Sequence, residues 1–177
     1  MTRVYSVGHS NLAADAFLAL LRDAGIGALA DVRRVPASRR YPHFARGPLT
    51  AALKEAGITY LWLGDGLGGR LEPTRARDAS PNAALRDPAL RAYADAQETP
   101  AFQRDLAALL ELAARVPTAV MCAERDWRQC HRQILADVLV ARGVEIVHLS
   151  PVAAPQPHEL APTARIEGNR VSYPGLL

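Results

Sequence analysis

Both cysteines of this 177-residue chain lie in one short passage, CAERDWRQCHR, over residues 122–132. An apolar run over residues 119–121 leads into the passage, and a helical pattern follows it. A thiol between a strand end and a helix N-terminus lies where backbone N–H groups favour a thiolate or a bound anion. The passage is therefore the leading candidate for a site, with Cys122, Glu124 and His131 as catalytic candidates.

Cys122 has several possible roles. Neighbouring arginines and a helix N-terminus would activate it as a nucleophile. Its spacing to Arg128, Cys-x5-Arg, is that of an anion-cradling loop, although this loop contains two acids and no glycine. Alternatively, Cys122 pairs with Cys130 as a redox couple, or joins Cys130, His131 and His9 as zinc ligands. Adjacent Cys130 and His131 would diverge by about 100° on a helix, which disfavours zinc. A plain buried cysteine is the remaining alternative, and we expect both thiols to be reduced.

Five arginines crowd the segment 31–46, and Asp31 is its only acid: Arg33, Arg34, Arg39, Arg40 and Arg46. Guanidinium groups bind phosphate or carboxylate oxygens with two parallel hydrogen bonds, and the interleaved Tyr41 or Phe44 can stack on a base. This density of charge favours anion binding. The alternative is a solvated loop in which Asp31 holds Arg33 or Arg34 in place.

Further candidates follow other apolar runs. His9 lies between a predicted strand and a predicted helix, a suitable position for a general base. Gly68-Gly69 could let a backbone approach an anion that Arg70 then clamps, but a Gly-Gly pair alone is a weak signal and a flexible turn explains it better. The expected substrate-binding residues are Ser10, Asp31, Arg33, Arg39, Arg40, His43, Gly69, Arg70 and Arg132. His148 and His158 are expected to be incidental.

Strand-like and helix-like segments alternate along the chain. The predicted strands are 4–7, 26–32, 58–63, 118–121 and 144–149. The predicted helices are 12–24, 49–56, 87–97, 100–115 and 130–142, with Ser10 or Asn11 capping the first. Residues 64–86 show no clear period and form either a functional loop or a mobile one. This alternation predicts a three-layer α/β fold, with a largely parallel sheet and helices on both faces.

One domain accounts for most of the chain. We expect a single α/β domain over residues 1–150 and a proline-rich tail, 151–177, packed on the surface, with a small hairpin near residues 165–173. No apolar run approaches a membrane span, and the start of the chain lacks the apolar core of a signal peptide. With two cysteines in total, these features predict a cytoplasmic protein without membrane partners. We expect no cofactor and no metal.

The predicted strands direct their loops to a common edge. In open α/β sheets, ligands bind outside the carboxyl ends of the strands, so we expect His9, Arg33 and Glu124 in one pocket. The leading hypothesis is an enzyme, a hydrolase or group transferase, that acts on an anionic and phosphate-bearing substrate, with Glu124 and His9 as acid–base groups. The alternatives are a non-catalytic nucleic-acid-binding module and a redox sensor built on Cys122 and Cys130.

Six motifs in order resemble the bacterial and archaeal domain-of-unknown-function family 488, over about residues 4–149. They are VGHSN (7–11), DVR (31–33), SRRYPHF (38–44), LGGR (67–70), CAE (122–124) and CHR (130–132). The resemblance implies a single α/β domain and brings no established activity. A fainter likeness is to rhodanese domains, in which a strand also ends in Asp-x-Arg and a later strand delivers a cysteine. Here the short glycine-rich cysteine loop of those domains is replaced by a longer acidic stretch.

Overall fold

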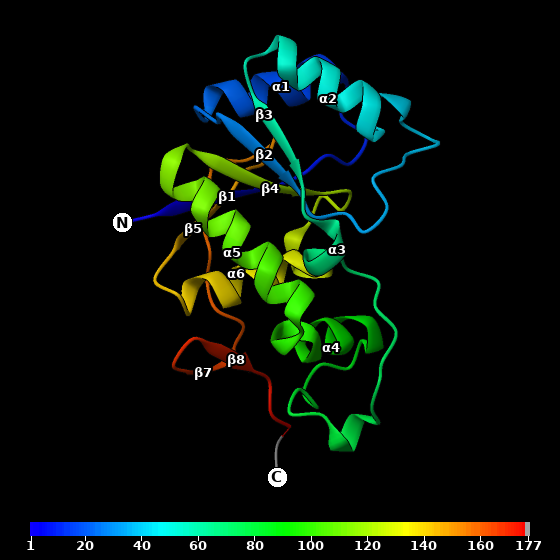
Figure 1. The fold of residues 1–177 in the computed structure, drawn as a ribbon, viewed down its shortest axis with the longest axis vertical. Helices are drawn as coiled ribbons and strands as arrows, with labels where there is room; N and C mark the ends of the chain where they lie inside the picture. Colours follow the sequence, from blue (N-terminus) through cyan, green and yellow to red (C-terminus); the bar gives the residue numbers. More distant parts are fainter. Residues whose placement is uncertain (176–177) are drawn as a thin grey trace.

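A six-stranded sheet forms the centre of the molecule, in the order β3-β2-β4-β1-β5-β6 (Figure 1). The computed structural model describes residues 1–175. The strands of this sheet are β1 (Arg3–Gly8), β2 (Ala28–Asp31), β3 (Thr59–Trp62), β4 (Thr118–Cys122), β5 (Glu145–His148) and β6 (Gln156–Pro157). Strands β1 to β5 are parallel, and only β6 runs antiparallel to its neighbour β5.

The helices between the strands are α1 (Ala14–Asp23), α2 (Arg46–Glu55), α3 (Gly64–Leu67), α4 (Pro88–Asp95), α5 (Pro100–Arg115) and α6 (Arg132–Val140). Short 3-10 turns occupy Pro42–Phe44, Arg77–Ala79, Ala96–Glu98 and Trp127–Gln129. A separate hairpin pairs β7 (Arg165–Glu167) with β8 (Arg170–Ser172), as the turn residues between them predicted.

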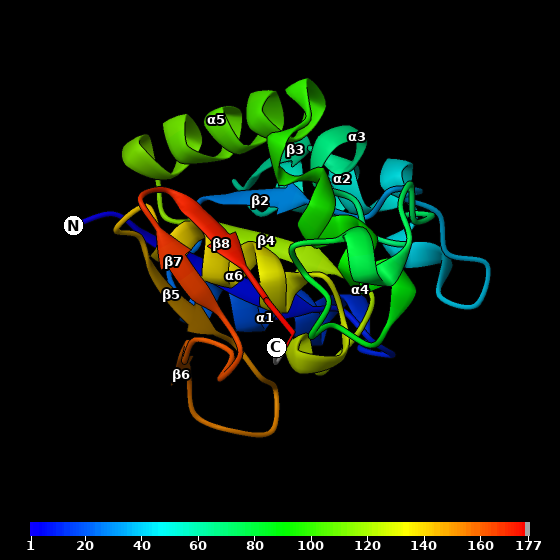
Figure 2. The same ribbon diagram turned by 90° about the horizontal axis from the view of Figure 1, so that it is seen from below.

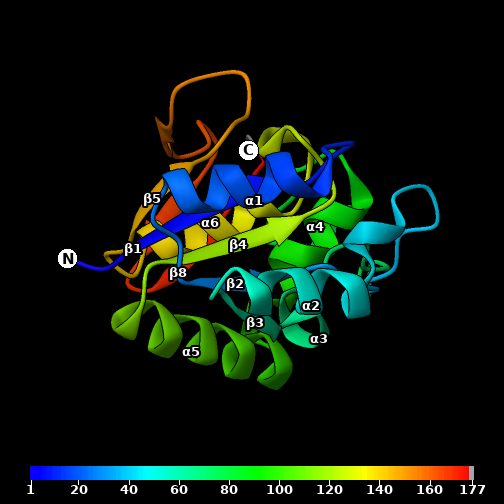
Figure 3. The same cartoon turned by 90° about the horizontal axis from the view of Figure 1, so that it is seen from above.

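The helices divide between the two faces of the sheet, which confirms the predicted three-layer α/β fold (Figures 1 and 3). From β1 through β2 to β3 the chain moves in one direction, so right-handed connections carry α1 and α2 over the same face. The chain then returns to β4 and continues to β5, which carries α3 to α6 over the other face. Each layer buries its own apolar cluster, with Phe17 and Leu53 in the first and Phe102 and Leu135 in the second.

Three predicted helix starts are wrong. Helix α2 begins at Arg46 rather than at residue 49. Helix α1 begins at Ala14 with no side-chain cap, because the backbone N–H of Ser10 donates to the Ala123 carbonyl and ties this turn to the loop after β4. Helix α6 begins at Arg132 rather than at Cys130, since a 3-10 turn precedes it and Cys130 has an extended backbone. The cysteine therefore lies in a loop, where its thiol is free to face a cleft.

The segment 64–86 is more ordered than its composition suggests. Its first four residues form α3, which packs on α5 through a 2.6 Å hydrogen bond from the Gly66 N–H to Asp105 Oδ2. The Tyr93 hydroxyl donates to the Leu67 carbonyl and connects the end of α3 to α4. The remainder descends along the molecule from α3 to α4 (Figure 1).

The proline-rich tail contributes to the core, whereas the sequence suggested a surface segment. It adds β6 to the sheet, and its hairpin packs against α6 (Figure 2). The His158 side chain and Tyr173 are both 0% exposed. Both donate hydrogen bonds to the carboxylate of Asp137 on α6, over 2.7 and 2.6 Å respectively. His158 is thus structural rather than incidental. Residues 176 and 177 of the predicted tail lie outside the described residues.

Candidate functional site

A cleft of about 380 Å³ opens at the carboxyl ends of β2 and β4. These strands are neighbours, and the chain leaves them toward opposite faces of the sheet, which is where open α/β sheets form their binding crevices. The walls come from residues 33–35 and 37 after β2, 69–70 after α3, 87 and 89–90 at the start of α4, and 122–124 and 129–131 at the end of β4 and after it. The carboxyl edge of the sheet, where a ligand site was expected, therefore carries this cleft.

The predicted site residues divide into two groups. The cleft is lined by Arg33, Gly69, Arg70, Cys122, Glu124 and His131. The residues that do not line it are His9, Ser10, Asp31, Arg39, Arg40, His43 and Arg132. The first group comes from the strand-end loops nearest the centre of the sheet. Most of the second group lies behind the cleft wall or on the loop that projects beyond it.

Arg33 reaches the cleft wall but its guanidinium is bound to internal partners. Its Nε and Nη2 donate to both carboxylate oxygens of Asp31, over 2.9 and 2.7 Å, and its Nη1 donates to the Phe44 carbonyl over 2.8 Å. Asp31 is fully buried and also accepts from the Tyr60 hydroxyl over 2.7 Å. The pair braces the loop after β2, so the structural role considered for Asp31 is the one observed.

His9 lies behind Arg33, which corrects its expected place in the pocket. Its Nδ1–H donates to the Ser10 carbonyl over 2.9 Å, which leaves Nε2 facing Arg33 Nη1 at 3.4 Å. Its ring stacks on Phe44 with centroids 4.2 Å apart. Burial lowers the pKa of His9 to about 4, so the imidazole is neutral and positions Arg33. His43 is similarly committed, donating from Nε2 to the Leu12 carbonyl.

Arg132 lies beneath the cleft rather than in its wall, so it does not meet a ligand directly. Only 1% of it is exposed. Nε donates to Cys122 Sγ over 2.9 Å, Nη1 donates to Ser6 Oγ over 3.0 Å, and Nη2 donates to the carbonyls of Glu124 and Arg125. Within residues 1–175 its partners are thus a thiol, a hydroxyl and backbone carbonyls. A buried guanidinium needs a counter-charge, and among these partners only the thiol can supply one.

The two cysteines form a close pair at the floor of the cleft. Their Sγ atoms are 3.4 Å apart, and both thiols are free and buried. Hydrogen bonding from the Cys122 thiol and the nearby Arg132 lower the pKa of Cys130 to about 6, against the opposing effect of burial. The same hydrogen bond and burial raise the pKa of Cys122. These opposite shifts favour a single thiolate shared by the pair, beside the Arg132 guanidinium.

His131 is held against Gly69 at one side of the cleft. Its Nε2–H donates to the Val32 carbonyl over 3.0 Å, which leaves Nδ1 as an acceptor. A Cβ atom added at Gly69 would lie 2.4 Å from that Nδ1, so only glycine permits this approach. Burial lowers the pKa of His131 to about 4. At neutral pH the ring is an uncharged hydrogen-bond acceptor. The Gly-Gly pair was the sequence signal for this contact.

Arg34 and Cys130 were missing from the predicted site set. Arg34 is exposed at the cleft, and its Nε donates to the Gly69 carbonyl over 3.3 Å. Arg70 is exposed nearby, with a left-handed φ of 60° that a non-glycine residue rarely adopts and that often marks functional positions. Val35, 70% exposed, and Leu90 supply apolar wall. The cleft thus combines two exposed arginines with an apolar side.

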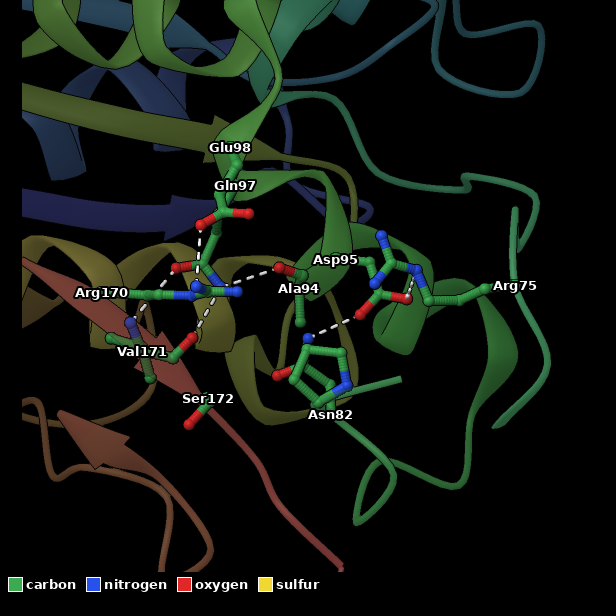
Figure 4. A pocket seen from close by; sticks show the side chains of 10 residues that line it. Arg75, Asn82, Ala94, Asp95, Gln97, Glu98, Arg170, Val171 and Ser172 are labelled. Carbon is green, nitrogen blue, oxygen red and sulfur yellow. Dashed lines mark hydrogen bonds and ion pairs between the residues drawn. The ribbon is translucent and has the colours of Figure 1, made fainter. Parts of the chain in front are cut away.

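A second, much smaller cavity of about 10 Å³ lies between α4 and β8 (Figure 4). Its polar side chains bond to one another: Asn82 Nδ2 donates to Asp95 Oδ1 over 2.7 Å, and Gln97 Nε2 donates to the Val171 carbonyl over 3.0 Å. An ion pair between Arg170 and Glu98 closes one side. A space of this size holds at most one water molecule. This region joins the tail hairpin to α4.

Two further findings concern residues 1–175. This part of the chain contains no group of three or more histidine, cysteine, aspartate or glutamate side chains that could hold a metal ion. In the same part, none of the helices has the length and apolar character needed to span a bilayer.

Comparison with known proteins places the chain in one family. The family model described as "Domain of unknown function DUF488" matches residues 13–139, so the chain belongs to this family. The match includes the cysteine pair, both exposed cleft arginines and α1 to α5. No curated protein and no solved structure matches the chain.

Proposed function

We propose that this DUF488 chain is a cysteine-dependent group-transfer enzyme that binds an anionic substrate in the cleft at the carboxyl edge of its sheet. Cys130 is the nucleophile, Cys122 is its hydrogen-bond donor, and Arg132 holds the negative charge of the pair. Arg34 and Arg70 bind the substrate anion. This assignment keeps the expected edge of the sheet and transfers the role of nucleophile from Cys122 to Cys130.

The observation that carries the proposal is the buried Arg132 beneath the cysteine pair. A guanidinium this deeply buried is costly unless an anion accompanies it. The thiol that it contacts belongs to a pair in which the pKa of Cys130 is lowered to about 6. A thiolate, rather than a thiol, is the reactive nucleophile. A cysteine pair with a purely structural role would not need a buried positive charge.

Substrate binding follows from the exposed part of the cleft. Arg34 and Arg70 are free to meet an anion, whereas Arg33 is bound to Asp31. Asp87 also lines the cleft, but its carboxylate accepts from the backbone N–H groups of Ala89 and Leu90 as the cap of α4. The volume of about 380 Å³ suits a small molecule, within the usual range of ligand sites.

The reaction proceeds by displacement at the electrophilic atom of the substrate. A bond forms between that atom and Cys130 Sγ, while the bond to the leaving group breaks and the leaving group keeps its electron pair. Glu124, exposed at the cleft, is positioned to transfer a proton to or from bound groups, and His131 Nδ1 accepts a hydrogen bond. A second nucleophile then releases the group from Cys130. Water in that role makes the reaction a hydrolysis.

Alkylation of the reduced protein tests this proposal. The rate of Cys130 modification by iodoacetamide should rise with a midpoint near pH 6, and anionic iodoacetate should react faster relative to iodoacetamide than it does with a free thiol. R34A/R70A should lose that relative preference, and the control R22A/R165A, at exposed arginines of α1 and β7, should keep it. A midpoint near the ordinary thiol value of about 8.5 contradicts the proposal.

A second candidate function rests on the loop between β2 and α2, which projects from the body of the molecule (Figures 1 and 3). Arg39 and Arg40 on this loop are exposed, and the Arg40 guanidinium lies 5.6 Å from the ring of Tyr41. Such a loop suits a non-catalytic nucleic-acid-binding module. Oligonucleotide affinity that falls steeply with salt and is abolished by R39A/R40A supports this candidate.

A further inference from the structure

The distance between the two cysteine sulfurs suggests a reaction that uses both. Sγ of Cys122 and Sγ of Cys130 are 3.4 Å apart, in van der Waals contact, whereas a disulfide requires about 2 Å. Both residues line the same cleft. A covalent intermediate formed on Cys130 would therefore have a second thiol, that of Cys122, within reach of the Cys130 sulfur.

We propose that the cysteine pair is a dithiol that reduces anionic disulfides, with Cys130 attacking the substrate and Cys122 resolving the intermediate. This inference rests on the proposed function, because it assigns the substrate class and second nucleophile of the same cleft. The substrate is a low-molecular-weight disulfide that carries carboxylate groups. Arg34 and Arg70 bind the carboxylates, and the apolar side near Val35 and Leu90 packs against the remainder.

The reaction consists of two displacements. The Cys130 thiolate attacks one sulfur of the substrate disulfide R–S–S–R, so a Cys130–S–S–R bond forms and RS⁻ leaves with the electron pair of the broken bond. Cys122 then loses its proton to the departed thiolate, which becomes RSH, and attacks Cys130 Sγ. The Cys122–Cys130 disulfide forms as a second RS⁻ leaves. The two cysteines lose two electrons, and the substrate disulfide gains them.

Arg132 makes re-reduction the favourable half of the cycle. In the reduced state the guanidinium is balanced by the shared thiolate, but in the oxidised state the pair is uncharged and Arg132 keeps only neutral partners. Burial of an unbalanced charge is unfavourable, so the oxidised form is destabilised relative to the reduced form. A couple whose reduced form is stabilised gives up its disulfide readily and is a weak reductant, so a small dithiol that regenerates the enzyme must drive the reduction of the substrate.

The cleft also contains two carboxylates that oppose an anion. Glu124 is exposed in the wall and forms no ion pair within residues 1–175, and Asp87, the cap of α4, is exposed as well. The two exposed arginines are therefore balanced by two exposed carboxylates, and anion binding depends on direct contact with the guanidinium groups of Arg34 and Arg70. The Glu124 carboxylate repels a dianionic ligand that approaches on its side.

The test uses reduced protein without oxygen and three disulfides of different charge. The anionic probes are glutathione disulfide and 5,5′-dithiobis(2-nitrobenzoate), and the cationic probe is cystamine. Wild-type protein should react about tenfold faster with glutathione disulfide than with cystamine, relative to their rates with a free thiol. R34A/R70A should remove this preference, and R22A/R165A should retain it. Equal preference in all three proteins overturns the assignment of an anionic substrate.

The products distinguish the dithiol from a single nucleophile. With 5,5′-dithiobis(2-nitrobenzoate), the wild type should release two thionitrobenzoate ions per chain and show an internal disulfide by intact mass. C122S, which keeps a hydrogen-bond donor beside Cys130, should release one ion and retain a mixed disulfide. C130S should react slowly, with no burst. If wild-type protein instead accumulates mixed disulfides on both cysteines, the dithiol proposal is wrong.

Failure of this inference can be separated from failure of the proposed function. An alkylation midpoint of Cys130 near the ordinary thiol value would contradict both the proposed function and the dithiol inference. Retention of that midpoint, together with a mixed disulfide that Cys122 never resolves, removes only the dithiol and leaves Cys130 as a nucleophile for another electrophile. Wild-type mass measurements alone supply this outcome even where a variant does not fold.

Discussion

Two buried charges in this molecule are balanced in different ways. Asp137 on α6 accepts hydrogen bonds from the Tyr173 hydroxyl, His158 Nε2 and the Ala161 N–H, all from the tail. Arg132 lies five residues earlier on the same helix. Its counter-charge can come only from the cysteine pair, which lines the cleft. The first arrangement is closed and serves stability. Under the proposed function the second is reactive, because its counter-charge is the nucleophile.

The histidines of the two regions have different partners. His131 has one nitrogen bonded and the other beside Gly69 in the cleft wall. In the tail region His158 lies between Asp137 and His148, 2.7 and 2.9 Å from their nearest atoms, and His148 stacks on Trp127 with centroids 3.9 Å apart. His148 Nδ1 is buried without a recorded partner within residues 1–175. The tail network therefore holds α6 and the Trp127 turn that carries Cys130.

The largest effect is expected from Asp137→Ala. This substitution leaves the donors of His158 and Tyr173 buried without an acceptor, and it should lower the free energy of unfolding by about 3 kcal/mol. Urea unfolding measures this, with D23A, an exposed aspartate of α1, as the control. The alkylation midpoint of Cys130 in the folded variant should stay near pH 6. A shift of that midpoint would show that the two regions are not separate.

Next is Cys122→Ala, which tests the cleft alone. Removal of the thiol donor should raise the pKa of Cys130, so the alkylation rate at pH 6.5 should fall about tenfold. C122S retains a donor and should keep most of the rate. The free energy of unfolding should change by under about 2 kcal/mol in both variants. Equal rates for wild type and C122A would exclude the shared-charge arrangement.

The pH dependence of stability should separate the regions further. Burial lowers the pKa of His9 and His131 to about 4 and that of His148 to about 3, while unfolded histidine titrates near 6.5. Between pH 6.5 and 4 the unfolded chain binds more protons, so stability falls as the pH falls, by up to about 1.4 kcal/mol per pH unit for each group. H148Q should reduce this slope. For Cys130, folded pKa about 6, the corresponding loss lies between about pH 8.5 and 6.

The smallest effect is expected from Arg39→Ala combined with Arg40→Ala. Both side chains are exposed on the projecting loop and neither lines the cleft, so stability should change by under about 1 kcal/mol. Reaction with glutathione disulfide should change by no more than a few fold. A loss as large as that of R34A/R70A would mean that the projecting loop closes on the substrate and belongs to the site.

Much of the fold could be predicted because its strands are short apolar runs separated by helical periods and closed by glycines. The helix starts could not, since Ser10 looks like a cap but bonds across space to the loop after β4. The same limit applied to the tail. Its prolines suggested a surface segment, while the buried places of His158 and Tyr173 depend on Asp137, which lies far away in the sequence.

The cleft lies at the expected edge of the sheet, but the residues that line it differ from those expected. Three of the four strand-end loops line it, whereas the loop after β1, with His9, does not. Arg33 and Arg34 carry the same sequence signal, yet only the fold shows that Arg33 turns inward to Asp31 while Arg34 stays exposed at the cleft. Cys130 was predicted at the start of a helix. The 3-10 turn over Trp127–Gln129 brings the two sulfurs into contact instead.

The most direct test of the central claim is a pH titration of thiolate absorbance in the reduced wild-type protein. Arg132 and the cysteine pair predict one thiolate per chain that forms with a midpoint near pH 6, with no second thiolate until well above the ordinary thiol range. C130S should abolish the early step. Absence of any thiolate signal below pH 8 would contradict the account, because the buried guanidinium would then have no anion beside it.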